Sequence, residues 1–139
     1  MSHVEFMSTA KVPKKLLLIP VILILIYGML SGYAYIDPEG FYEVMEIPYP
    51  AHEFFIQSWA GKNTAMLTVL LLSTLSRRLL PLMIAMIMLL VGQAGDAVAG
   101  ARTDVDVFIT YIALALTLIQ IGATKGWLMN MKKNYKAKR

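Results

Sequence analysis

The chain has no cysteine and only two histidines in 139 residues. Without cysteine there can be no disulfide exchange, no thiolate metal site and no cysteine-ligated iron–sulfur cluster. Both histidines, His3 and His52, lie outside the long apolar runs, so a haem held between two histidines inside a membrane is excluded. No serine, histidine and acid set can be assembled inside those runs, and no level of them holds enough ligands for a metal. We therefore expect neither a metal site nor nucleophilic catalysis.

Charged residues are also scarce, at 16% of the chain, whereas hydrophobic residues make up 58%. Soluble domains have about 45–50% apolar residues, so the composition is typical of a membrane protein. Four apolar runs cover residues 16–36, 56–75, 79–99 and 105–127, and each has the roughly 20 residues that a helix needs to cross a bilayer. With short links between neighbours, the sequence predicts an all-α fold. We expect one integral membrane domain over residues 1–139, built as a four-transmembrane-helix up-down-up-down bundle.

The charges that are present have an uneven distribution. Eleven of the 13 basic residues lie before the first run, between the second and third, and from Lys125 to the end of the chain, while acidic residues crowd the connection 37–55. The positive-inside rule then places both termini in the cytoplasm. We expect residues 128–139 to form a basic cytoplasmic tail that contacts anionic membrane lipids rather than nucleic acid. The first run is long for a secretory signal, and we expect it to be an uncleaved anchor in a bacterial inner membrane.

The connection 37–55 is the longest between the apolar runs, and it begins with a helix-start pattern. Asp37 suits the N-cap position and Pro38 suits the first helical position. The predicted apolar side of this short helix consists of Phe41, Val44, Met45 and Ile47. We expect a helix lying on the outer surface of the membrane, and the pattern fits either an amphipathic connector or a lid over a pocket.

Two ionisable residues, Lys62 and Asp96, stand inside the apolar runs, where charge is costly and marks a functional site or a buried pair. The link 76–78 makes their helices an antiparallel hairpin. Counted from the ends of that hairpin, Lys62 lies about 21 Å and Asp96 about 25 Å along the helices, so both belong to one layer in the outer half of the membrane. The candidate ligand-binding residues of this layer are Lys62, Asn63, Gln93, Asp96 and Trp59.

Three interpretations of this layer remain open. A Lys62–Asp96 pair could simply fix the register of two helices, or Lys62 could extend its amine to the membrane surface. Alternatively, the layer forms the polar end of a pocket for a lipophilic molecule (a lipid, a quinone or a sterol-like compound), with Asn63 and Gln93 orienting the ligand and Trp59 packing against it. This binding protein, without established catalysis, is our leading expectation. The alternatives are an accessory subunit of a larger membrane complex or homo-oligomer, and a membrane enzyme whose catalytic residues the sequence does not reveal.

Other side chains inside the apolar runs are less specific indications of a binding pocket. Tyr27 lies well inside the first run, so its hydroxyl is expected to have a partner. Met66, Met83, Met86 and Met88 fit adaptable core packing or the wall of a pocket for a flexible ligand.

The segment Gln57-Ser58-Trp59-Ala60-Gly61-Lys62-Asn63, the apolar run after it, the Arg-Arg turn and Gln93-Ala94-Gly95-Asp96 resemble the DoxX-like group of small four-helix membrane proteins. In that pattern a basic residue followed by Asn opens the second helix and an Asp ends the third. Arginine is commoner than lysine at the position of Lys62, and a glycine follows shortly where this chain has Met66 and Leu67. The resemblance implies a four-helix bundle more firmly than an activity. One relative is a quinone-linked thiosulfate-oxidising subunit, which suggests a quinone-like ligand.

Overall fold

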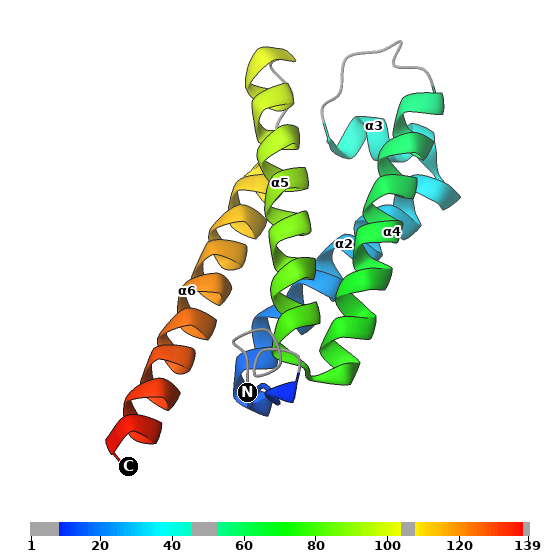
Figure 1. The fold of residues 1–139 in the computed structure, drawn as a ribbon. Coiled ribbons are helices and arrows are strands. Elements are labelled where there is room, and N and C mark those ends of the chain that lie inside the picture. Colours follow the sequence, from blue (N-terminus) through cyan, green and yellow to red (C-terminus); the bar gives the residue numbers. More distant parts are fainter. Residues whose placement is uncertain (1–8, 46–52, 104–107, 138–139) are drawn as a thin grey trace.

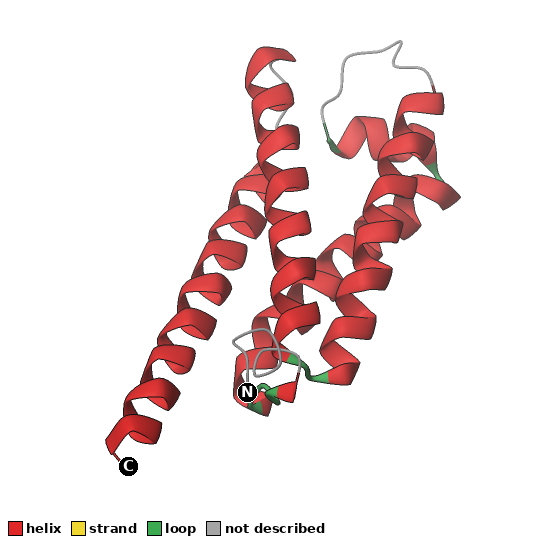
Figure 2. Ribbon diagram, in the orientation of Figure 1, coloured by secondary structure: helices red, strands yellow, loops and turns green. Residues whose placement is uncertain are grey.

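The computed structural model describes residues 9–45, 53–103 and 108–137. All regular elements within these ranges are helices (Figure 2), which confirms the predicted all-α class. In chain order they are a 3-10 helix η1 Lys14–Leu17, then α2 Leu18–Ile36, α3 Pro38–Val44, α4 Glu53–Ser76, α5 Leu79–Thr103 and α6 Phe108–Ala137. The last helix continues ten residues past position 127, the predicted end of the fourth span, so the chain enters the basic tail as helix.

Three helical stretches are long and apolar enough to cross a bilayer: Lys14–Ile36, Leu79–Arg102 and Phe108–Met131. They correspond to the first, third and fourth predicted spans and are consistent with an integral membrane protein. The second predicted span lies within α4, which has 24 residues but includes Lys62 and Asn63 among several polar side chains. Length and composition therefore support three of the four predicted spans.

The four long helices alternate in direction along the chain (Figure 1). Helix α2 leaves the end where the N-terminal segment lies, α4 returns to it, α5 leaves again and α6 comes back. Helix α2 packs on α4, α4 on α5, α5 on α6 and α6 on α2. The α2–α4 contact is the most extensive of the four. This order brings the polar halves of α4 and α5 next to each other.

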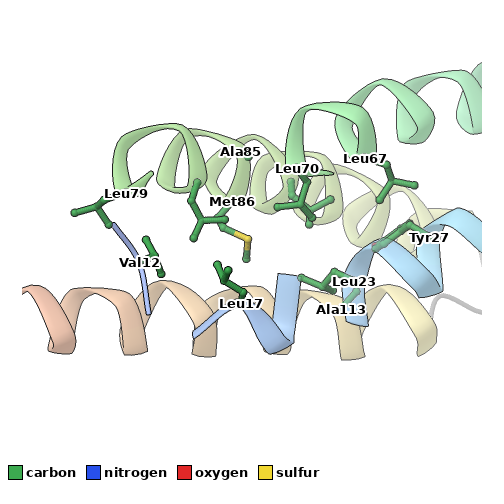
Figure 3. Close-up of a cluster of buried hydrophobic side chains, with 12 residues drawn as sticks. Val12, Leu17, Leu23, Tyr27, Leu67, Leu70, Leu79, Ala85, Met86 and Ala113 are labelled. Atoms are coloured by element: carbon green, nitrogen blue, oxygen red, sulfur yellow. The ribbon is translucent and has the colours of Figure 1, made fainter. Parts of the chain in front are cut away.

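The main apolar cluster lies toward the end at which α4 turns into α5 (Figure 3). Its buried members include Leu17, Leu23, Leu67, Leu70, Leu79, Leu82, Ala85, Met86, Leu89 and Ala113, with Tyr27 at one side. Met86 is fully buried there and Met83 packs against the cluster, which agrees with core packing for these two methionines. Met88 is 45% exposed and does not belong to this core.

Helix α3 begins as the sequence predicts. The Asp37 side chain accepts a hydrogen bond from the Gly40 backbone N–H at 2.9 Å, and Pro38 occupies the first turn. The predicted apolar side is only partly correct. Phe41 is buried and Met45 half-buried, but Val44 is 65% exposed, and Ile47 lies outside the described residues. The second buried side chain of α3 is Tyr42, the residue after Phe41, because α3 packs against α2 and α4 on the side that carries these two residues.

The N-terminal segment pairs with the α4–α5 turn. The Val12 N–H donates to the Arg77 carbonyl at 2.8 Å, and the Leu79 N–H donates to the Ala10 carbonyl at 3.0 Å. These two bonds flank an isolated antiparallel bridge between Lys11 and Arg78. Val12 is fully buried in the main cluster, so residues 10–12, before the first span, are part of the fold.

Candidate functional site

Lys62 and Asp96 form an ion pair between α4 and α5. The Lys62 Nζ lies 2.5 Å from Asp96 Oδ1, and the two side chains are 42% and 19% exposed. Among the residues that the structure describes, there is no other ion pair. The pairing agrees with the depth estimate made from helical rise, which placed both residues in one layer. These exposures place the pair at the edge of the α4–α5 contact rather than in the buried interior.

One helical turn closer to the hairpin, Gly92 of α5 lies close to the Met66 side chain of α4. A Cβ atom added to Gly92 would lie 2.9 Å from Met66 Sδ. Met66 follows Lys62 by four residues, and Gly92 precedes Asp96 by four, so both contacts obey one antiparallel register. Residues four apart share a helix face. The ion pair and the close approach therefore fix the same alignment of the two helices.

The two amides of the layer lie on the interior side of their helices. Gln93 and Asn63 are each only 1% exposed. The Asn63 Nδ2 donates to the Trp59 carbonyl at 3.0 Å, within its own helix. The Asn63 Oδ1 and both polar atoms of the Gln93 amide have no hydrogen-bond partner among the described residues. The structure thus separates the predicted site into a bordering ion pair and an interior set of amides with unused hydrogen-bonding capacity.

Tyr27 of α2 adds a third helix to this interior set. Its hydroxyl lies close to the Gln93 amide and within electrostatic range of the Asp96 carboxylate. The hydroxyl and the amide do not meet the geometric criteria for a hydrogen bond. The hydroxyl is therefore buried without a hydrogen-bond partner in the described part of the chain. Ser31, one turn further along α2, also has a buried hydroxyl without a described partner. The sequence had indicated that Tyr27 needs a partner; it had given no signal for Ser31.

Trp59 has a neighbour that the sequence did not predict. Its ring is 5.3 Å from the ring of Phe41 on α3, in a tilted arrangement, and Phe41 in turn meets Tyr33 edge-on at 6.1 Å. Trp59 is half-buried and borders both apolar clusters. It therefore connects the interior set of amides to α3, which covers the outer part of the α2–α4 contact.

The described residues contain no group of three or more His, Asp or Glu side chains that could hold a metal ion. No protein-family model, curated protein or solved structure matches this chain. The groups at this site are the buried polar side chains of Tyr27, Asn63 and Gln93, which we call the polar trio, and the Lys62–Asp96 ion pair.

Proposed function

We propose that the chain is an integral membrane protein in which α4 crosses the bilayer in addition to α2, α5 and α6. The support comes from the Lys11–Arg78 bridge, which holds residue 11 and residue 78 at the same end of the molecule. Between those residues the chain leaves this end through α2 and returns through α4. If α2 crosses the bilayer, α4 must cross it back, because otherwise the bridge partners would be separated by its thickness. The polar side chains of α4 are then carried into the membrane by the more apolar helices around it.

Within this bundle, we propose that the polar trio binds the head of a lipophilic molecule. The observation that carries the proposal is the set of buried polar atoms without described partners on three different helices. A buried donor or acceptor left unpaired costs about 1–3 kcal/mol, and hydrocarbon around the bundle supplies no substitute for water. A ligand head group that forms these bonds would recover that free energy.

The unused atoms define the chemistry of the head group. The Gln93 Nε2 donates, the Asn63 Oδ1 and Gln93 Oε1 accept, and the Tyr27 hydroxyl does both. A head that only accepts, such as a quinone carbonyl, would leave the Asn63 oxygen unpaired. A hydroxyl group donates and accepts at once, so a sterol-like alcohol, a quinol or a lipid hydroxyl matches the site best.

The ion pair has a supporting role in this proposal. Lys62 and Asp96 hold α4 and α5 in the register that places Asn63 and Gln93 at one level, and they present charge at the border of the site. The DoxX-like resemblance belongs to the same proposal, since its two short motifs, Lys62-Asn63 and Gln93 to Asp96, lie opposite each other. Loss of the pair through Asp96→Asn or Lys62→Met should abolish ligand retention while the protein still inserts.

The test is native mass spectrometry of the protein extracted in native lipid discs without detergent. We expect a stoichiometric small molecule on the wild type that is lost in Tyr27→Phe and Gln93→Met. Thr117→Val is the matched control, because the Thr117 hydroxyl is fully buried but bonds to the Ala113 carbonyl of its own helix. Equal occupancy in all variants would contradict the proposal. Stoichiometric protein partners without a small molecule would instead identify an accessory subunit.

A further inference from the structure

The Lys11–Arg78 bridge places two cationic side chains side by side. The bonds from Val12 to Arg77 and from Leu79 to Ala10 flank the bridge, so Lys11 and Arg78 are a non-hydrogen-bonded antiparallel pair. In such a pair the two Cα atoms are about 4.5 Å apart and the side chains leave the same face. Both residues are exposed. Like charges directly opposite each other on paired strands are destabilising.

No described acidic side chain compensates this pair. The described ion pair, Lys62–Asp96, is in the other half of the bundle, and α3 with its acidic residues lies at the opposite end. Two further cations, Lys14 and Lys15, are exposed in η1, which starts three residues after Lys11. The bridge therefore concentrates positive charge where the fold provides no described carboxylate.

The turn itself is rigidly held. Arg77 has a φ of 53°, in the left-handed region that residues other than glycine rarely occupy. The Arg77 N–H donates within α4 to the Ser73 and Thr74 carbonyls, while its guanidinium donates to the Val12 carbonyl at 3.2 Å. Backbone hydrogen bonds therefore hold Lys11 and Arg78 in place, together with the Arg77 side chain, which is bonded to the N-terminal segment.

Apolar surface adjoins the cations. Lys14 and Leu18 are four residues apart, and Leu18, Val21 and Leu25 follow on one side of α2 at 63%, 42% and 59% exposure. We infer that the Lys11–Arg78 bridge is a binding site for the phosphate of an anionic phospholipid, whose acyl chains lie along the apolar surface of the helices. A lipid phosphate would screen the repulsion between Lys11 and Arg78, and a basic cluster at the membrane surface attracts anionic lipid. The site is far from the polar trio and does not depend on it.

The experiment uses the full chain in discs of neutral phosphatidylcholine with and without phosphatidylglycerol. Native mass spectrometry of protein released from the mixed discs should show phosphatidylglycerol retained on the wild type and lost on Lys11→Gln/Arg78→Gln. The control Arg102→Gln/Lys125→Gln removes the same charge from exposed positions of α5 and α6 and should retain the lipid. The exchange variant Lys11→Arg/Arg78→Lys keeps both charges and should also retain it. Adding inorganic phosphate should not displace the lipid; displacement would assign the site to a free phosphate.

A second readout separates this site from a structural role. In neutral discs, Lys11→Gln should raise the thermal midpoint of unfolding, because it removes the repulsion and leaves the backbone bonds intact. Addition of phosphatidylglycerol should raise the midpoint of the wild type but not that of the double variant. Equal lipid loss in Lys11→Gln/Arg78→Gln and in the control double variant would show a general electrostatic effect and overturn the inference. Unchanged retention in Lys11→Gln/Arg78→Gln would overturn it as well.

Discussion

Gln93 is a single residue at which stability and ligand binding should conflict. It is 1% exposed, and neither polar atom of its amide has a described hydrogen-bond partner. Methionine has a similar length and no such demand. We therefore expect Gln93→Met to stabilise the ligand-free protein by about 1–3 kcal/mol, the cost of burying unpaired polar atoms. Thermal unfolding after removal of lipids would measure this, with Thr117→Val as the control whose lost hydroxyl was already bonded.

The opposite result would also be informative at this residue. A loss of stability in ligand-free Gln93→Met would mean that the amide makes a hydrogen bond within the folded chain. This result would contradict the proposal that the polar trio binds a ligand. With ligand present, the order should reverse. The wild type gains stability by mass action on binding, and the variant does not.

The Lys62–Asp96 pair leads to a second residue-scale prediction. Removal of either partner leaves one charge between α4 and α5 without its counter-ion, so Lys62→Met and Asp96→Leu should each destabilise the protein. The double variant should cost less than the sum of the two, with a coupling free energy of about 0.5–3 kcal/mol. The lower part of that range is favoured, because the Lys62 side chain is 42% exposed and partly solvated. Unfolding free energies of the four proteins give the coupling.

Lys125→Met serves as the control for this cycle, since Lys125 is an exposed lysine of α6. Its replacement should change stability little. Additive effects of the two single variants would show that the ion pair contributes nothing to the α4–α5 register.

At the scale of helices, the α4–α5 contact depends on a small residue at position 92. A Cβ atom there would meet the end of Met66, which is flexible, so Gly92→Ala should be tolerated. Gly92→Leu cannot be accommodated in the same way and should cost about 1–3 kcal/mol, as overpacking does. It should also weaken the ion pair one turn away. The companion change Met66→Ala should restore part of the loss in thermal stability.

Gly95 provides the contrast on the same helix. A Cβ atom at Gly95 would meet no atom within 4 Å. Gly95→Ala should therefore stabilise α5 by up to about 1 kcal/mol, since alanine is a better helix former. If Gly92→Leu and Gly95→Ala had the same effect, the close approach of α4 and α5 would not be a determinant of the fold.

The helices themselves could be predicted because each leaves a local pattern. Apolar runs located α2, α4, α5 and α6, and Asp37 with Pro38 located α3. The shared level of Lys62 and Asp96 followed from helical rise and a short turn, whereas their pairing was one of three open interpretations. The β-bridge at Lys11 could not be predicted, because it depends on a few bonds between segments far apart in sequence and on an arginine in a left-handed conformation. The role of Tyr27 was equally out of reach, since it requires knowledge of which face of α2 meets α5.

For the whole molecule, the number of spans can be tested directly, because the chain has no native cysteine and single cysteines can serve as reporters. Lys11→Cys lies before α2, Glu39→Cys lies in α3, and Lys125→Cys lies in α6, six residues before Met131, where the apolar stretch of that helix ends. If α4 crosses the membrane together with α2, α5 and α6, Glu39→Cys should react with a membrane-impermeant thiol reagent added to intact cells. Lys11→Cys and Lys125→Cys should react only after the membrane is opened.

The decisive position is Ser76, the last residue of α4 and exposed. Ser76→Cys should behave like Lys11→Cys, because the bonds from Val12 to Arg77 and from Leu79 to Ala10 hold these segments together on one side. Labelling of Ser76→Cys from outside would place α4 on the membrane surface and leave three spans. The Lys11–Arg78 bridge could not then exist in the membrane, and the anionic lipid site would fall with it. The polar trio would also lose its helix α4, so this one measurement bears on every functional inference drawn from the fold.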